Sequence, residues 1–214
     1  MLKSYGINRM NIRSSEELRC RVLEIDSAQK GDKREAILQA ALELVAEHGL
    51  QHTPMSLISK RSKASAGIIY HYFENKEDLI QSLYSQVKRD LERALMSADD
   101  LGQPVARRFQ SVLLNAFRYC ISHPQEMAFL EQCESLPMPT PDDPFPDDQV
   151  QALHGLWADL HTQDLIKDLP DEVIGEFTLA VMRRLARQSV AGVITLDETM
   201  LLNIVSACWD AIAR

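Results

Sequence analysis

The amino-acid sequence predicts an all-α fold, with a small three-helix unit followed by a larger helical region. From Lys33 onward, apolar residues recur three and four positions apart, which is the spacing of one face of a helix. No segment alternates apolar and polar residues in the manner of a half-exposed strand. Five of the nine prolines fall within 137–146, which predicts a loop there because proline cannot continue a helix.

The small unit is predicted at 31–78, after a flexible polar extension over 1–30. Its first helix begins near Lys33 and stops at Gly49. Thr53 and Ser65 precede the next two helices, where a hydroxyl can accept a hydrogen bond from the first turn. The predicted helices span about 33–48, 54–62, 65–73 and 75–97, and the apolar stripe of the first is Ile37, Ala40, Ala41, Leu44 and Val45.

The larger region is predicted over 79–214, with Pro124 separating two of its helices and a further helix at about 148–162. Two closing helices are expected at about 171–191 and 197–213. Their apolar faces are broader than one core-facing stripe, which indicates a second burial partner. The alternative is that both faces are buried within one chain.

Charge is distributed unevenly along the 214 residues, whose net charge is −8. Residues 1–99 hold 15 Lys and Arg against 14 Asp and Glu, whereas residues 100–214 hold 8 against 17. Between Leu50 and Phe73 there are three basic residues and no acidic one. Local charge decides whether a surface meets phosphate, so the overall acidity does not exclude nucleic acid as a partner.

The segment SAGIIYHYFENK, residues 65–76, is predicted to divide its side chains between core and surface. Ile69 and Phe73 are four positions apart and share one helix face, which we expect to be buried. The opposite face carries Ala66, Gly67, Tyr70 and His71. Two short helices joined by a tight turn after a longer helix describe a helix-turn-helix, whose last helix enters the DNA major groove.

The residues over 33–79 resemble the N-terminal domain of TetR-family transcriptional regulators. The motifs that carry the resemblance are ILQAALELVAEHG in the first helix, the threonine that leads the second, and SAGIIYHYFENKEDL across the third and fourth. The family usually has Ala-Gly-Val in the turn, where this chain has Ser62-Lys63-Ala64. Losing the glycine costs stability if Lys63 takes a positive φ.

The resemblance implies double-stranded DNA as a partner and assigns contacts to it. Tyr70, Lys76 and Thr53 match the family's phosphate contacts. Ser65 is a cap at the start of the groove helix, and Tyr72 is left open between the groove edge and packing against the fourth helix. The candidates for base-edge or groove contacts are Ser56, Ala66, Gly67, Ile68 and His71.

The resemblance also implies a homodimer through the last two helices, and a small-molecule effector bound inside the C-terminal region. A lining rich in aromatic residues suits a hydrophobic or aromatic ligand, although such residues at helical spacing are also typical of a plain core. The leading interpretation is therefore a repressor that its ligand releases from a palindromic operator. The candidate lining residues are Phe117, Tyr119, Cys120, Met127, Phe129, Trp157 and His161.

Three other interpretations remain open at this point. The first keeps DNA binding but makes Cys120 and Cys133 a redox sensor, and the others are a helical enzyme and a helical adaptor. No phosphate-binding loop, nucleophile elbow or zinc motif is present, so we expect no catalytic residue, no metal and no cofactor. No run approaches the roughly 20 apolar residues of a membrane span. We therefore expect a cytoplasmic protein without a membrane partner.

Overall fold

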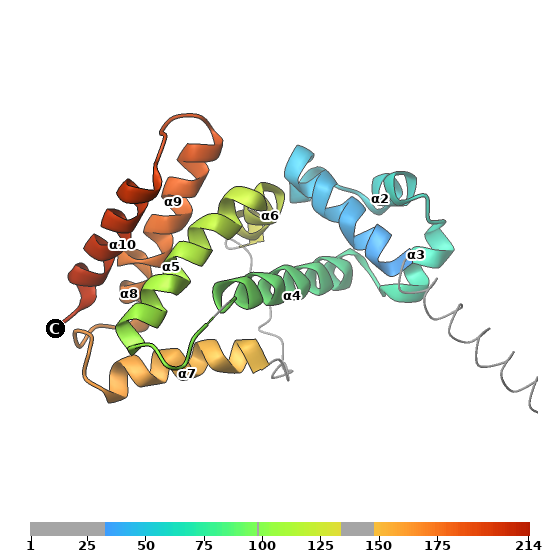
Figure 1. The fold of residues 1–214 in the computed structure, drawn as a ribbon. Coiled ribbons are helices and arrows are strands. Elements are labelled where there is room, and N and C mark those ends of the chain that lie inside the picture. The colour runs from blue at the N-terminus through green and yellow to red at the C-terminus, as the bar shows by residue number, and fades with distance from the viewer. Residues whose placement is uncertain (1–32, 98, 134–147) are drawn as a thin grey trace, which may run out of the picture.

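The computed structural model of the protein describes residues 33–97, 99–133 and 148–214, and the side chains only from 151 in the last range. The regular structure in these ranges is helical, which confirms the all-α class (Figure 1). The extension predicted over 1–30 and the proline-rich loop over 137–146 lie outside the described residues. After a helix over 33–48 come η1 (Leu50–His52), α2 (Met55–Ser62), α3 (Ala66–Tyr72), α4 (Lys76–Leu95), α5 (Val105–Ser122), α6 (Pro124–Cys133), α7 (Asp148–Thr162), α8 (Asp171–Phe177), α9 (Leu179–Val190) and α10 (Glu198–Ile212).

Two groups of helices lie at opposite ends of the molecule (Figure 1). The N-terminal lobe consists of residues 33–75, and the C-terminal lobe consists of α5 to α10. Helix α4 runs from one lobe into the other as a single helix, across the predicted boundary between residues 78 and 79. In the C-terminal lobe α5 is central, because α4, α7, α9 and α10 all pack against it.

The N-terminal lobe buries the residues that the helical spacing predicts. The stripe of its first helix, Ile37, Ala40, Ala41, Leu44 and Val45, is buried throughout. Ile58 from α2 and Ile69 from α3 complete this core together with Phe73, and all three are almost fully inaccessible to solvent. The burial of Ile69 and Phe73 is therefore confirmed.

The single helix predicted over 171–191 is wrong, because the structure breaks it at Thr178 into α8 and α9. Thr178 is fully buried, and its hydroxyl donates a hydrogen bond of 2.7 Å to the Ile174 carbonyl. A threonine hydroxyl that bonds the preceding turn competes with the helical ladder and bends the chain. Gly175, three positions before Thr178, further weakens the helix here because glycine has a low helix propensity.

One side chain of α6 ties the two lobes together at the end of the helix over 33–48. Gln132 Nε2 donates to the Val45 carbonyl over 3.1 Å, and Gln132 Oε1 accepts from the Leu50 backbone N–H over 2.8 Å. Gly49 lies between these two groups with a φ of 85°, a conformation that glycine adopts without steric cost. Backbone groups at the C-terminal end of this helix therefore find hydrogen-bond partners in the other lobe.

Candidate DNA-binding surface and effector cavity

The turn between α2 and α3 is held by short-range hydrogen bonds. Lys63 ends α2 with φ 57° and ψ 21°, the left-handed conformation in which an L side chain is strained. Ser59 Oγ donates to the Ala64 carbonyl over 2.6 Å across this turn. Ser65 Oγ then accepts from the Ile68 N–H, so Ser65 caps α3 as predicted. These contacts fix the position and direction in which α3 begins.

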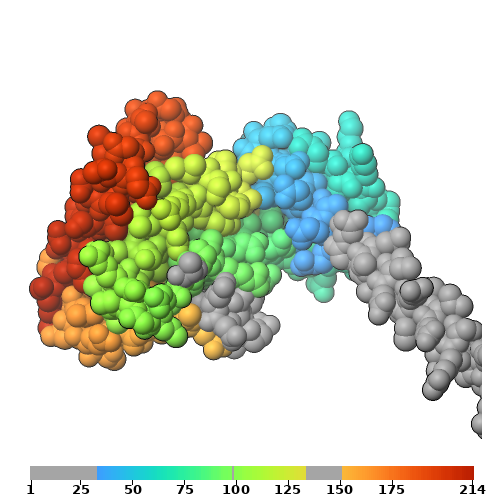
Figure 2. Space-filling model, in the orientation of Figure 1, coloured from blue at the N-terminus to red at the C-terminus, as the bar shows by residue number. Residues whose placement is uncertain are grey.

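Helix α3 presents four residues outward in the phase that the sequence predicts. Ala66, Gly67, Tyr70 and His71 are exposed, and Tyr70 keeps 56% of its surface accessible. The lobe that carries them projects from the end of the molecule farthest from α10 (Figure 2). Two small residues at the start of the helix permit close approach to a partner, and two longer ones follow them with hydrogen-bonding atoms.

Ile68 and Tyr72 lie at the edges of this exposed face. Both are half-buried against the core. The Tyr72 ring meets the His71 ring edge-on, with centroids 5.2 Å apart, and lies tilted against Phe73 at 6.4 Å. Tyr72 is thus partly a packing residue that also flanks His71. Ser56 on α2 is exposed beside the turn.

Thr53 and Lys76 bond to backbone carbonyls just before α2. Thr53 is fully buried, and its hydroxyl donates to the Gly49 carbonyl over 2.9 Å instead of capping α2, which begins after Pro54. Lys76 Nζ donates to the Leu50 carbonyl over 2.7 Å and is half-buried. Both polar groups therefore link η1 to the helices that follow it.

The basic residues near the turn differ in their ion-pair partners. Lys60, Arg61 and Lys63 are all exposed. Arg61 forms a bidentate pair with Glu47, at 2.8 and 3.0 Å, and a third bond to Glu43 at 3.1 Å. The hydrogen bond from Arg61 lowers the pKa of Glu47. Arg61 therefore fastens α2 to the first helix, and the two lysines supply the positive charge of the surface.

A cavity of about 410 Å³ lies in the C-terminal lobe, between α4 and α9. Its lining is mostly apolar, with charged residues contributed by α4, α8 and α9. The sequence reveals only part of this set, because apolar residues that line a cavity have the same helical spacing as those that fill a core. The lining includes Tyr84, Lys88, Leu91, Glu92, Leu95, Cys120, Met127, Leu130, Leu153, Glu172, Glu176, Leu179 and Arg183.

The seven residues predicted to line one effector pocket are distributed over several environments. Cys120 and Met127 line this cavity, with their sulfur atoms 3.2 Å apart. Phe117 and Phe129 are buried in the core, and Tyr119 borders a different cavity. The other two lie elsewhere: Trp157 packs edge-on against Phe109 with centroids 5.4 Å apart, and His161 is exposed, with Nε2 2.8 Å from Asp171.

Two family models match this chain. The model for bacterial regulatory proteins of the tetR family matches residues 37–83, and the model for the tetracyclin repressor-like C-terminal domain matches residues 104–213. The second match alone spans half of the chain. The chain belongs to the TetR family. The predicted resemblance is therefore confirmed, and it extends beyond the helix-turn-helix to the C-terminal lobe.

Relatives of known sequence are likewise transcriptional regulators. An uncharacterized HTH-type transcriptional regulator of Haemophilus influenzae is 25% identical over 190 residues, which is 86% of this chain and 98% of that relative. The HTH-type transcriptional regulator UidR of Escherichia coli K12 is 44% identical over 62 residues, 29% of this chain and 30% of UidR.

Solved structures share the architecture over most of the chain. A TetR-family regulator from Marinobacter aquaeolei has a TM-score of 0.79 at 21% identity, over 87% of this chain and 98% of that one. A TetR-family protein from Vibrio parahaemolyticus has a TM-score of 0.72 at 26% identity, over 85% of this chain and 99% of that one. Within the described ranges, no helix is long and apolar enough to cross a bilayer.

Proposed function

We propose that this TetR-family protein is a homodimeric repressor that a small hydrophobic or aromatic ligand releases from a palindromic operator. The observation that carries the proposal is the division of α3, whose inner face is locked by Ile69 and Phe73 while the outer face is exposed. A recognition helix needs this arrangement, because a rigid inner face holds the outer side chains in register with base edges.

On this surface His71, Ser56 and the exposed start of α3 contact base edges, while Tyr70 contacts phosphate. Ala66 and Gly67 allow the backbone to approach the groove, Ser65 caps the helix there, and Ile68 and Tyr72 border the contact. Thr53 reaches a phosphate only by exchanging its hydrogen bond to the Gly49 carbonyl, whereas the Lys76 ammonium keeps two further hydrogens for a phosphate beside its bond to the Leu50 carbonyl. Their first role is thus to hold η1 in place beneath the DNA.

The first test is a gel-shift titration against DNA from upstream of the protein's own gene. We expect palindrome-specific binding that weakens steeply with salt. The logarithm of the binding constant should fall with the logarithm of the salt concentration, with a slope of about −0.9 per neutralised phosphate. His71→Ala should alter sequence preference, by about 1–3 kcal/mol at one base pair, whereas Lys60→Ala should weaken binding to all sequences alike. Salt-insensitive or sequence-indifferent binding by the unmodified protein contradicts the proposal.

Apolar side chains exposed on the C-terminal lobe support dimerisation through the last helices. Phe177 at the end of α8 keeps 50% of its surface accessible, and Val190 and Met200 are similarly exposed on α9 and α10. Large apolar side chains that a single chain leaves exposed are candidates for a protein interface. Sedimentation velocity should give a dimer, and Phe177→Asp should convert it to monomer. A monomer for the unmodified protein would exclude this arrangement.

The cavity between α4 and α9 supports the effector part of the proposal. Its volume falls in the range of ligand sites, and its apolar walls with a few charged groups suit a molecule with a hydrophobic body and a polar group. Such a ligand releases DNA only if it binds the DNA-incompetent arrangement of the dimer more tightly. Leu153→Trp should fill the cavity and leave DNA binding intact while abolishing release.

The ligand can be sought by mass spectrometry of small molecules extracted from the purified protein. Compounds found there should weaken DNA binding by the unmodified protein but not by Leu153→Trp. If both proteins respond alike, the ligand acts elsewhere. The redox interpretation gains no support, because Cys120 and Cys133 are both buried and burial raises the pKa of each thiol to about 11.

A further inference from the structure

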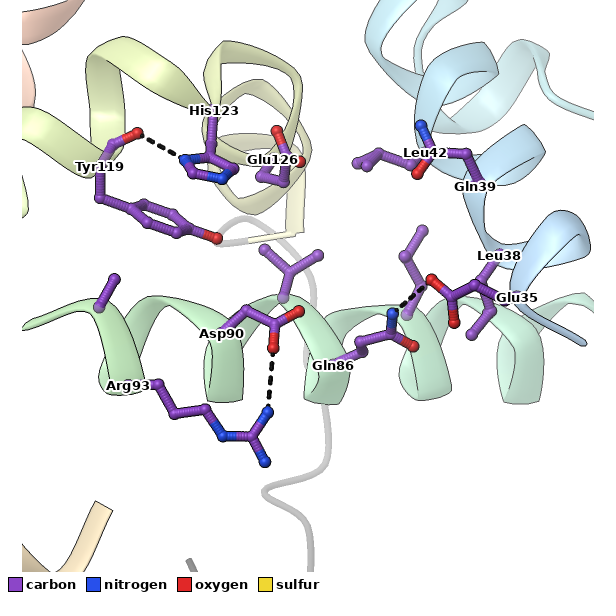
Figure 3. Close-up of a pocket in the computed structure, with 13 residues that line it drawn as sticks. Glu35, Leu38, Gln39, Leu42, Gln86, Asp90, Arg93, Tyr119, His123 and Glu126 are labelled. Carbon is purple, nitrogen blue, oxygen red and sulfur yellow. Dashed lines mark hydrogen bonds and ion pairs between the residues drawn. The ribbon is translucent and has the colours of Figure 1, made fainter. Parts of the chain in front are cut away.

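A second cavity of about 410 Å³ lies between the two lobes, on a different face of α4 from the first (Figure 3). The helix over 33–48 forms one wall, α4 forms the floor, and the junction of α5 and α6 forms the opposite wall. Leu42 and Val87 give it an apolar side. The seven residues predicted to line an effector pocket share only Tyr119 with the lining of this cavity.

Tyr119 aims its hydroxyl into this cavity. Only 6% of its surface is accessible, and its ring stacks on the His123 ring with centroids 4.1 Å apart and planes 13° apart. Oη points toward the space between α4 and α6 (Figure 3), and no described residue forms a hydrogen bond with it. Burial raises the pKa of this phenol, so it stays neutral at physiological pH. No buried polar side-chain atom of the described residues lacks a partner, so this hydroxyl is open to the cavity, where a bound molecule can accept from it or donate to it.

His123 lies beside this hydroxyl, with Nδ1 3.1 Å from the Tyr119 carbonyl oxygen and 2.9 Å from Ser122 Oγ. In the tautomer that donates from Nδ1 to this carbonyl, Nε2 is an acceptor, and no described residue donates to it. Figure 3 shows the ring next to Glu126 at the same end of the cavity.

Three carboxylates face the cavity against one guanidinium. Glu35 accepts from Gln86 Nε2 over 2.8 Å, and Asp90 pairs with Arg93 over 3.2 Å. Glu126, on α6, has neither a hydrogen bond nor an ion pair to any described residue. The end of the cavity formed by Tyr119, His123 and Glu126 thus consists of groups that accept hydrogen bonds, with one net negative charge. A matching ligand donates hydrogen bonds and is positively charged.

We propose that this cavity between the lobes binds a small aliphatic amine, whose ammonium group lies among Glu126, Tyr119 Oη and His123 Nε2. Its apolar chain lies along Leu42 and Val87, and a second ammonium group, where present, reaches the carboxylate of Glu35 or Asp90. Because the walls belong to both lobes, a bound amine holds the helix over 33–48 against α6, beside the contacts of Gln132.

The test is isothermal titration of the full-length protein with 1,6-diaminohexane, in the absence of DNA. Two compounds of the same chain length serve as controls, 1,6-hexanediol without charge and adipate with two negative charges. We expect saturable binding of the diamine, binding of the diol at least tenfold weaker, and none of adipate. Equal affinities for diamine and diol, or no binding of the diamine at 10 millimolar (about −3 kcal/mol or weaker), would overturn the proposal.

Variants locate the bound amine. Glu126→Gln should lower the affinity for the diamine about tenfold, as expected for the loss of a hydrogen bond to a charged group. Tyr119→Phe keeps the ring stack and should lower this affinity a few-fold. Glu198→Gln removes an exposed carboxylate on α10 that pairs with Arg118, and it should change nothing. An unchanged affinity in Glu126→Gln, with its melting temperature intact, contradicts the site. Since no DNA is present, this outcome is independent of the proposed repressor function.

Discussion

The two lobes are stabilised in different ways. In the N-terminal lobe, side chains close hydrogen bonds to neighbours in the sequence: Ser65 caps α3, and Asn75 caps α4 by accepting from the Asp78 N–H over 2.8 Å. In the C-terminal lobe, Asp197 caps α10 by accepting from the Met200 N–H over 2.7 Å, but α5 and α8 begin after prolines without a side-chain cap, as α2 does in the other lobe. Their stability comes from apolar packing around α5. A DNA-binding surface needs exact local geometry, whereas a lobe that holds a ligand needs a core with room in it.

The largest expected effect is on the N-terminal core. Phe73→Ala removes a fully buried ring and should lower the free energy of unfolding by about 4 kcal/mol. The ring also lies 5.4 Å from the Arg34 guanidinium. Phe177→Ala in the C-terminal lobe should cost less than about 1 kcal/mol, since half of that side chain is exposed. Because we place Phe177 in the dimer interface, Leu101→Ala just before α5, where 79% of the residue's surface is exposed, is the control that is independent of dimerisation, and it too should cost less than about 1 kcal/mol. Urea unfolding of the variants measures the difference, and equal losses would show that burial does not set the cost of these substitutions.

A slightly smaller effect is expected where α5 meets the preceding loop. Arg108 is 7% exposed and makes a bidentate pair with Asp99, at 2.7 and 2.9 Å, with Asp159 at 3.6 Å. Asp99→Ala leaves a buried guanidinium with one distant partner and should cost about 3 kcal/mol. The exposed pair of Arg118 and Glu198 is the control, and Glu198→Ala should cost less than about 0.5 kcal/mol. A similar loss in both variants would mean that burial does not set the strength of these pairs.

The turn of the N-terminal lobe offers a stabilising substitution. Lys63→Gly relieves a left-handed conformation and should raise the free energy of unfolding by about 1 kcal/mol. Lys60→Gly removes the same charge from the interior of α2 and should lower it by about 1 kcal/mol. Both should weaken DNA binding by a similar factor. Thermal unfolding and gel shifts of the pair separate backbone strain from charge, and a destabilised Lys63→Gly would contradict the strain.

The smallest effect concerns the chemistry of the buried thiols in the C-terminal lobe. With a pKa of about 11, Cys120 and Cys133 carry a thiolate fraction of roughly one in a thousand at pH 8. Alkylation of these two thiols in the folded protein should therefore be slow and should quicken about tenfold per pH unit up to pH 11. Mass spectrometry of the peptides that contain them, after iodoacetamide treatment, measures this rate. Rapid labelling of Cys120 or Cys133 in the folded protein at pH 7 would restore the redox interpretation.

The sequence predicts most of the N-terminal lobe because its determinants are local. Ser65 and Asn75 cap their helices where the motif indicates, and the buried and exposed faces of α3 follow from a spacing of four. The role of Arg61 was not predictable, since its partners Glu43 and Glu47 lie on the preceding helix. The strained φ of Lys63, by contrast, was signalled by the missing glycine.

In the C-terminal lobe the sequence predicts the helices, but it does not predict which of their residues fill the core and which line a cavity. A periodic apolar stripe does not reveal whether the residues it brings inward fill a core or leave a cavity, so Phe117 and Phe129 lie in the core while Cys120 and Met127 border a space. The break at Thr178 likewise depends on where that hydroxyl is buried.

By itself, the sequence determined the all-α class, the helix-turn-helix and the side of α3 that faces outward. Each of these follows from side chains within a few positions of one another, whose interactions do not depend on the rest of the fold. Only the tertiary structure decided that Gln132 joins the lobes, that Thr53 and Lys76 bond to the chain around η1, and that Tyr119 and His123 face a space beside Glu126. These arrangements bring together groups far apart in the chain, and packing alone determines where they meet.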